Sequence, residues 1–141
     1  MKAAAICSAI LLAGCSEKPS VAPGIPLVTE IFVADIKVSR AFYEQLGFSA
    51  THNEETFAEM QFGGQKLFLS QRKDNPRPSQ PAANVRIPVP DVDRYWKLAQ
   101  DMKANVVTPI GDRFYKERDF LITDPDGFGL RFASLLPGGK W

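Results

Sequence analysis

The hydrophobic residues from position 27 onward alternate in short segments and twice change to helical spacing. Each helical segment stands between the first and the second of four strand-like segments. The expected strands are 28–33, 48–52, 57–62 and 66–70 in the first half of the domain, and 84–89, 105–108, 118–123 and 128–132 in the second half. Both halves therefore read β-α-β-β-β, and the chain contains an internal repeat.

The two expected helices have clear starts and apolar stripes. Asp35 suits the N-cap of the first helix, Gly47 suits its end, and either Asp91 or Asp93 suits the N-cap of the second helix. We expect the apolar stripe of each helix to pack on the strands. The stripes are Val38, Ala41, Phe42 and Leu46 in the first helix, and Val92, Tyr95, Trp96, Ala99 and Met102 in the second.

One helix covers only one face of four strands, so something else must cover the other face. Two halves side by side can form one curved, eight-stranded mixed sheet, with helices on its convex side and an open concave cleft. The expected fold class is therefore α+β, with two βαβββ modules. A proline-rich polar connection, 72–82, joins the halves, and the turn Asp124-Pro125-Asp126-Gly127 precedes the last strand.

Composition limits the possible functions. The 141 residues suffice for one domain with its own hydrophobic core. The net charge is +1 and no basic run exceeds two residues, so nucleic-acid binding has no electrostatic support. Both cysteines, Cys7 and Cys15, precede the expected domain, which leaves it without disulfides or thiol chemistry.

The first 15 residues have the features of a targeting segment. Lys2 is followed by an uncharged, mostly apolar run, 3–13, which is too short for a hydrocarbon core that needs about 20 residues. The run ends in Leu11-Leu12-Ala13-Gly14-Cys15, which resembles the lipobox of bacterial lipoproteins. A plain secretory signal that happens to contain a cysteine is the alternative.

The lipobox resemblance implies cleavage before Cys15 and attachment of lipid to its thiol. Ser16 at the next position implies sorting to the outer membrane, so we expect a protein of the cell envelope, anchored at the periplasmic face of that membrane. The expected organisation is a signal peptide at 1–15, a flexible tether at 16–26, the domain at 27–135 and a tail at 136–141.

Three segments of the domain resemble the vicinal oxygen chelate superfamily, which includes glyoxalase I, extradiol dioxygenases, and fosfomycin- and bleomycin-resistance proteins. The segments are Phe32-Val33-Ala34-Asp35-Ile36, Ser39-Arg40-Ala41-Phe42-Tyr43-Glu44-Gln45-Leu46-Gly47-Phe48 and Asp124-Pro125-Asp126-Gly127-Phe128. The likeness spans 27–134. These segments form helix cores, helix ends and a turn, so the resemblance implies a fold and not by itself an activity.

Enzymes of this superfamily hold a divalent metal on the concave face, with one ligand on each of four equivalent strands. The resemblance places those ligand positions at Val28, Phe68, Asn84 and Arg131, of which two are apolar and one is a permanent cation. His52, the one histidine, lies on a strand that supplies no ligand. Shifting the register by two brings in Glu30, but its partners complete no site. We therefore expect no metal and no cofactor.

The concave face carries the candidate ligand-binding residues Glu30, Phe32, Phe68, Asn84, Arg86 and Arg131. The phenylalanines suit stacking on a planar group, and the arginines suit a carboxylate or phosphate. The alternative is a satisfied surface in which Glu30 and Glu59 pair with these cations. The loop 110–117, with Phe114 and Tyr115, is either a lid over the cleft or a solvated surface segment.

The favoured function is a lipid-anchored, metal-independent protein that binds a small organic molecule in its concave cleft. The resemblance to bleomycin-resistance proteins implies a homodimer with ligand sites between chains. One alternative is a metal-dependent lyase or dioxygenase, with Glu30 as a weak candidate for its catalytic base. Another is an envelope protein-interaction module, whose cleft would be filled by its own side chains or by Phe114 and Tyr115.

Overall fold

The computed structural model describes residue 24 and residues 26–141 of the chain. The expected signal peptide, Cys15 and nearly all of the expected tether lie outside these residues. The first module contains β1 (Thr29–Val33), α1 (Ile36–Gln45), β2 (Ser49–Asn53), β3 (Phe57–Phe62) and β4 (Gln65–Gln71). The second contains β5 (Asn84–Pro88), α2 (Val92–Asp101), β6 (Asn105–Asp112), β7 (Glu117–Thr123) and β8 (Gly129–Leu135). Neither described helix is long and apolar enough to cross a membrane.

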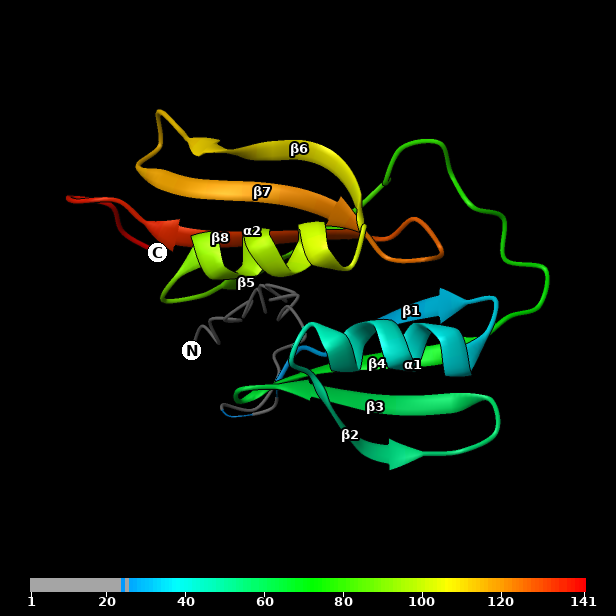
Figure 1. The fold of residues 1–141 in the computed structure, drawn as a ribbon. Coiled ribbons are helices and arrows are strands. Elements are labelled where there is room, and N and C mark those ends of the chain that lie inside the picture. Colours follow the sequence, from blue (N-terminus) through cyan, green and yellow to red (C-terminus); the bar gives the residue numbers. More distant parts are fainter. Residues whose placement is uncertain (1–23, 25) are drawn as a thin grey trace, which may run out of the picture.

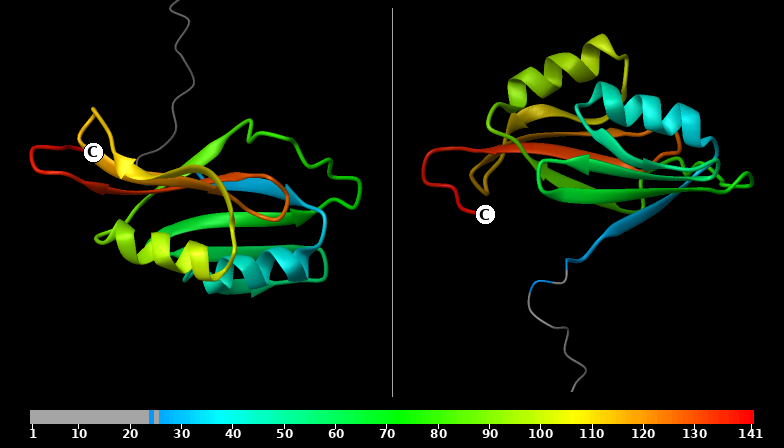
Figure 2. Two further views of the ribbon diagram at one scale, coloured as in Figure 1. Left: turned by 45° about the horizontal axis from the view of Figure 1, so that its top comes forward. Right: turned by 90° about the horizontal axis from the view of Figure 1, so that it is seen from below.

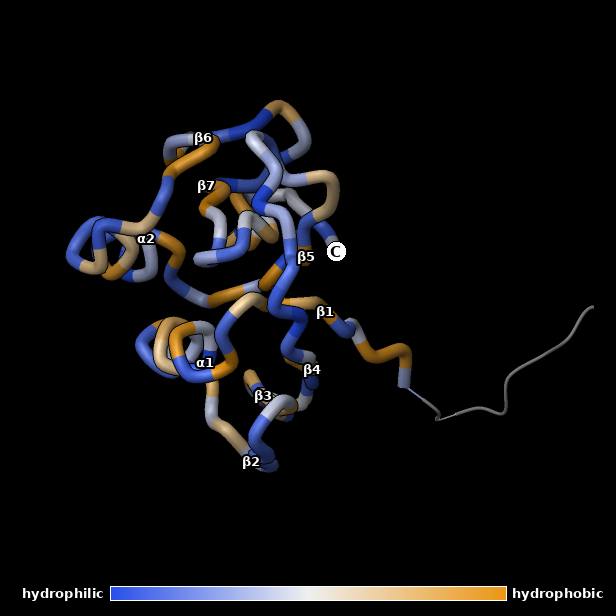
Figure 3. The backbone as a smooth tube through the Cα atoms, turned by 90° about the vertical axis from the view of Figure 1, so that its right-hand side faces the viewer, coloured by the Kyte–Doolittle hydropathy of each residue, from blue (hydrophilic) through white to orange (hydrophobic). Residues whose placement is uncertain are grey.

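The strands form two mixed sheets of identical topology (Figure 1). Sheet A has the order β1-β4-β3-β2 and sheet B the order β5-β8-β7-β6. The pairs β1–β4 and β5–β8 are parallel, and the remaining pairs are antiparallel. Both helices lie on the same side of the strands (Figures 2 and 3). The α+β fold class with two βαβββ modules is confirmed.

The two modules do not share one continuous hydrogen-bonded sheet, which differs from the eight strands expected. In the described residues β1 and β5 are both edge strands, and no hydrogen bond between backbone atoms joins the modules. The Val89 amide donates to the Ala133 carbonyl at 2.9 Å, so the neighbouring Pro88 is directed toward the free edge of β5. Pro88 has no amide hydrogen to offer there, which suits an unpaired edge.

One hydrophobic core nevertheless runs through both modules. Its buried members include Val33 and Leu69 from sheet A and Ile87 and Phe132 from sheet B. The apolar stripe of α2 packs as expected, with Asp91 as its N-cap. Tyr95 stacks on Phe132 with ring centroids 5.0 Å apart, and this pair lies beside Phe62 of the first module.

The packed face of α1 differs from the expected stripe. Val38 is 53% exposed and Ala41 is also exposed, whereas Ser39 and Tyr43 are fully buried. The cause is hydrogen bonding to the second module, because Ser39 and Tyr43 each donate to an aspartate of the turn 124–127. Phe42 and Leu46 pack against the core as expected, so a stripe counted from apolar residues alone predicts only part of the packed face of this helix.

The Asp124–Gly127 turn joins the two modules through buried side chains. Asp124 Oδ1 accepts the amides of Asp126 and Phe128 at 3.0 and 2.8 Å, and its Oδ2 accepts the Tyr43 hydroxyl at 3.0 Å. Asp126 accepts the Ala34 amide at 2.8 Å. Burial raises the pKa of both Asp124 and Tyr43, and the nearby Asp124 carboxylate raises the pKa of Tyr43 further.

Half of the expected loop 110–117 is strand. β6 continues to Asp112 and β7 begins at Glu117, so only Arg113–Lys116 form the connection. Lys116 adopts the left-handed conformation with φ 63°, which closes this tight turn. The connection is therefore shorter than the expected loop, and its Tyr115 lies over sheet B, as described below.

We predict that Tyr43→Phe destabilises the fold by about 2 kcal/mol, because it leaves a buried oxygen of Asp124 without its hydrogen-bond donor. The measurement is the free energy of unfolding in urea. Tyr95→Phe is the matched control, since the Tyr95 hydroxyl makes no hydrogen bond to other residues of 26–141. Equal stability of the two variants would contradict a structural role for this bond.

Candidate ligand-binding site

The concave face of sheet A carries polar residues that are mostly paired with one another. Ser70 donates to Glu30 Oε1 at 2.5 Å, and Lys66 Nζ lies 2.8 Å from Glu59 Oε1. The hydrogen bond from Lys66 lowers the pKa of Glu59. Neither glutamate contacts an arginine of sheet B, so the expectation that they neutralise Arg86 and Arg131 is wrong.

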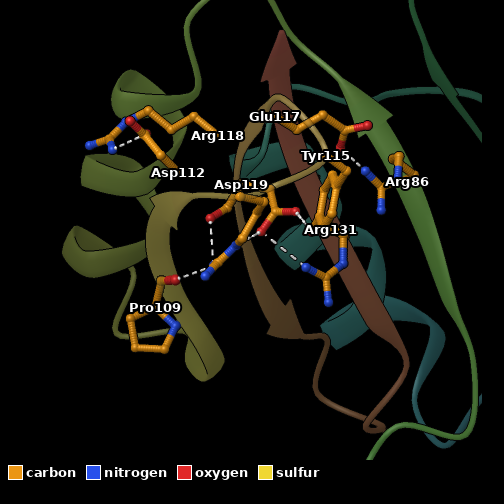
Figure 4. A network of polar contacts seen from close by, with 9 residues as sticks. Arg86, Pro109, Asp112, Tyr115, Glu117, Arg118, Asp119 and Arg131 are labelled. Carbon is orange, nitrogen blue, oxygen red and sulfur yellow. Dashed lines mark hydrogen bonds and ion pairs between the residues drawn. The ribbon is translucent and has the colours of Figure 1, made fainter. Parts of the chain in front are cut away.

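The carboxylates that do pair with those arginines come from β7. Asp119 is fully buried, and its Oδ1 lies 2.8 Å from Arg113 Nε and 3.0 Å from Arg131 Nη1 (Figure 4). Tyr115 donates its hydroxyl to Asp119 Oδ2 at 2.6 Å. Sequence reasoning missed Asp119 because it stands among buried apolar residues of β7. The one available signal was strand alternation, which places Asp119 on the same face as Leu121 and Thr123.

The charge of Asp119 is stabilised although it is buried. Burial by itself raises the pKa of this carboxyl group. The hydrogen bonds from Tyr115 and Arg113, together with the charges of Arg131 and Arg113, outweigh that effect and hold the pKa below its usual value. The concave face of sheet B is thus held together by an ionised network, which Tyr115 covers.

Two arginines lie side by side next to this network. Arg86 of β5 and Arg131 of β8 are register partners on adjacent parallel strands, and both project from the concave face. Arg86 forms an ion pair with Glu117, and its guanidinium carbon lies 5.7 Å from the centre of the Tyr115 ring (Figure 4). The pairing places two cations in one row, each next to one carboxylate of β7.

A cavity of about 520 Å³ lies between the modules and is lined by residues of both. Its wall is mostly apolar, and its charged residues are Arg86 and Lys66. We call it the seam cavity; it is lined by Leu27, Thr29, Phe48, Phe62, Gly63, Gln65, Lys66, Leu67, Val85, Arg86, Ile87 and Pro88. A second, shallower hollow of about 280 Å³ lies under the connection between the modules.

The structure distributes the six expected ligand-binding residues over several surroundings. Arg86 lines the seam cavity, whereas Glu30 and Phe32 line the second hollow. Arg131 belongs to the Asp119 network, and Phe68 packs edge-on against Phe57 at 5.4 Å.

Asn84 lies opposite Gly129 on the neighbouring strand. A Cβ atom added to Gly129 would stand 2.7 Å from the Asn84 Cβ. The six residues therefore share the concave side of the molecule and not a single cavity.

The residues at the superfamily's metal-ligand positions do not fit a divalent cation. Arg131 brings a guanidinium paired with Asp119, and Val28 and Phe68 have no donor atom. Within residues 26–141 no three His, Cys, Asp or Glu side chains stand close enough to hold a metal. His52 is exposed and contacts Glu54 at 2.9 Å.

We predict that Asp119→Asn destabilises the protein by about 3 kcal/mol at pH 7, because it leaves Arg113 and Arg131 without their counter-charge. The pKa of Asp119 is lower in the folded state than its ordinary 3.8, so this stabilisation is complete above pH 3.8 and declines as the pH falls through the folded-state pKa. The measurement is urea unfolding of both proteins from pH 7 to pH 2.5.

The matched control for this prediction is Asp101→Asn, which breaks an exposed ion pair with Lys97 and costs at most about 1 kcal/mol. A difference between wild type and Asp119→Asn that does not shrink in acid would contradict the ionised network.

Comparison with known proteins assigns the chain to a family. Residues 25–132 match the family model of the Glyoxalase/Bleomycin resistance protein/Dioxygenase superfamily. A bleomycin resistance protein of Geobacillus stearothermophilus is 28% identical in an alignment 121 residues long, which covers 74% of this chain and 92% of that protein.

Two solved structures illustrate the shared fold. A glyoxalase/bleomycin resistance protein/dioxygenase from Nocardioides has a TM-score of 0.67 and 20% identity, over 85% of this chain and 90% of its own. A lactoylglutathione lyase from Agrobacterium tumefaciens has a TM-score of 0.64 and 16% identity, over 79% and 94%. With two βαβββ modules and a family match across nearly all described residues, the chain belongs to the glyoxalase/bleomycin resistance protein/dioxygenase superfamily.

Proposed function

We propose that this protein binds a small organic molecule, without a metal ion, in the cleft between its two modules. The observation that carries the proposal is the seam cavity, which has about 520 Å³ and a mostly apolar wall with two cations. Ligand sites usually have roughly 300–1,000 Å³, apolar walls and a few polar groups. Relatives named for bleomycin resistance also favour capture of an organic compound.

A metal-dependent lyase or dioxygenase is less well supported by the residues. Such an enzyme needs imidazole or carboxylate ligands on the four equivalent strands, where this chain has Val28, Phe68, Asn84 and Arg131. Glu30, the weak candidate for a base, accepts a hydrogen bond from Ser70 beside the second hollow. We therefore propose binding without turnover.

We further propose a homodimer anchored to the envelope through lipid on Cys15. The family match supports the dimer, since the resemblance to bleomycin-resistance proteins implies one. The lipobox-like segment 11–15 supports the anchor, and Ser16 supports the periplasmic face of the outer membrane as the location.

One observation favours a second candidate, an envelope protein-interaction module. Tyr115 covers the concave face of sheet B with its hydroxyl bound to Asp119, so this part of the cleft is filled by the protein's own side chain. Phe114 beside it is 95% exposed and suits contact with another protein. In this alternative the seam cavity has no ligand.

We predict that native mass spectrometry of the protein, purified without a chelator, finds a co-purified organic mass and no stoichiometric metal. Val85→Trp fills the seam cavity and should remove that mass. Val106→Trp is the matched control, because Val106 is partly exposed on β6, away from the cavity, and should leave the mass in place.

Two results would contradict the proposal. A stoichiometric metal whose removal by EDTA also abolishes binding would favour the enzyme. An empty cavity together with a co-purified protein lost on Phe114→Ser would favour the interaction module.

We predict that Cys15→Ser moves the protein from the membrane fraction to the soluble periplasmic fraction, because the substitution removes the thiol that would carry the lipid. Fractionation and metabolic labelling with a palmitate analogue measure the change. Cys7→Ser, within the expected apolar run, is the control and should keep the label. Labelling of Cys15→Ser would refute the lipid anchor.

A further inference from the structure

We infer that the ligand of the seam cavity is a monocarboxylate on an apolar ring or chain, with its carboxylate on Arg86 and its apolar part against Phe48, Phe62 and Leu67. This inference rests on the proposed function and specifies the class of ligand.

Arg86 is available to an incoming anion. It joins the cavity wall to the charged row of sheet B, because it lines the cavity and is the register partner of Arg131. Its side chain is 39% exposed, and its Nη1 pairs with Glu117. A guanidinium has five N–H donors in a planar fork, so the rest of the Arg86 fork is available to a carboxylate.

The charge balance of this region favours a single negative charge. Three guanidinium groups, those of Arg86, Arg113 and Arg131, face two carboxylates, those of Glu117 and Asp119. One positive charge is left over at Asp119, which Arg113 and Arg131 share, and Arg131 is the register partner of Arg86. Lys66, the other cation of the cavity, is already balanced by Glu59 at 2.8 Å. A monoanion neutralises the remaining positive charge, whereas a phosphate dianion would leave a net negative charge.

The remaining wall selects the body of the ligand. Phe48 and Phe62 lie with ring centroids 4.8 Å apart and form an aromatic wall, and Leu67, Val85 and Ile87 continue the apolar surface. An apolar body buried there gains the hydrophobic contribution, while the mouth with Arg86 keeps the carboxylate in a partly solvated position.

The experiment compares two probes of equal shape, 2-naphthoate and the neutral 2-naphthamide, by isothermal titration of the purified protein. We expect 2-naphthoate to bind about tenfold more tightly, as a charge-assisted bidentate contact predicts. Arg86→Gln should remove this difference and leave 2-naphthamide binding unchanged. Lys97→Gln, which removes a distant exposed cation, should change neither affinity.

A second variant separates recognition from a structural role of the Arg86–Glu117 pair. Glu117→Gln removes the carboxylate that competes for Arg86, so 2-naphthoate should bind about threefold more tightly while 2-naphthamide is unaffected. If Arg86 only maintains the fold, breaking the pair from either side weakens binding of both probes. The double variant Arg86→Gln/Glu117→Gln, which leaves neither charge unpaired, reports on Arg86 when the single variant is unstable.

The outcomes distinguish a wrong class of ligand from a wrong binding site. Equal affinity for the two probes, or tighter binding of 2-naphthamide, overturns the carboxylate inference and leaves a binding function standing. Failure of both probes to bind at about millimolar concentration, under conditions where the protein is folded, overturns the inference and the seam cavity as a binding site together.

Discussion

The buried contact between Tyr43 and Asp124 determines how the two modules fit together. It lies in the core, it links α1 to the turn before β8, and the same turn binds the start of α1 through Asp126. A buried carboxylate costs free energy unless it is fully hydrogen-bonded, so this turn tolerates only the arrangement that brings Tyr43 to it. The relative position of the sheets, and with it the width of the seam cavity, depends on that arrangement.

The same constraint gives the molecule two distinct polar regions. At the turn 124–127 the hydrogen bonds cross between modules and are largely buried. On the concave side of sheet B the polar groups stay within one module and carry net positive charge. The contacts at the turn thus connect the two modules, whereas the contacts on sheet B stabilise the second module by itself.

Periodicity predicted the elements of this fold because strand alternation and helix spacing are local properties. All eight strands and both helices were expected near their observed positions, except that β6 continues to Asp112 and not only to residue 108. The burial of Ser39 and Tyr43 on α1 was not predictable in this way, since their hydrogen-bond partners are more than 80 residues away in the sequence. The partners of Arg86 and Arg131 were missed for the same reason, because ion pairs across strands depend on register, which residue counting alone does not fix.

The unpaired edge at Pro88 has an evolutionary consequence. Because no backbone-to-backbone hydrogen bond crosses the seam between the described modules, the two modules that line the pocket share no sheet ladder across it. Exchanges among residues such as Phe48, Phe62 and Ile87 alter its volume and shape without disrupting a sheet ladder. A duplicated module that leaves its joint free of backbone pairing can thus diverge toward new small molecules through side-chain substitutions, while its scaffold stays the same.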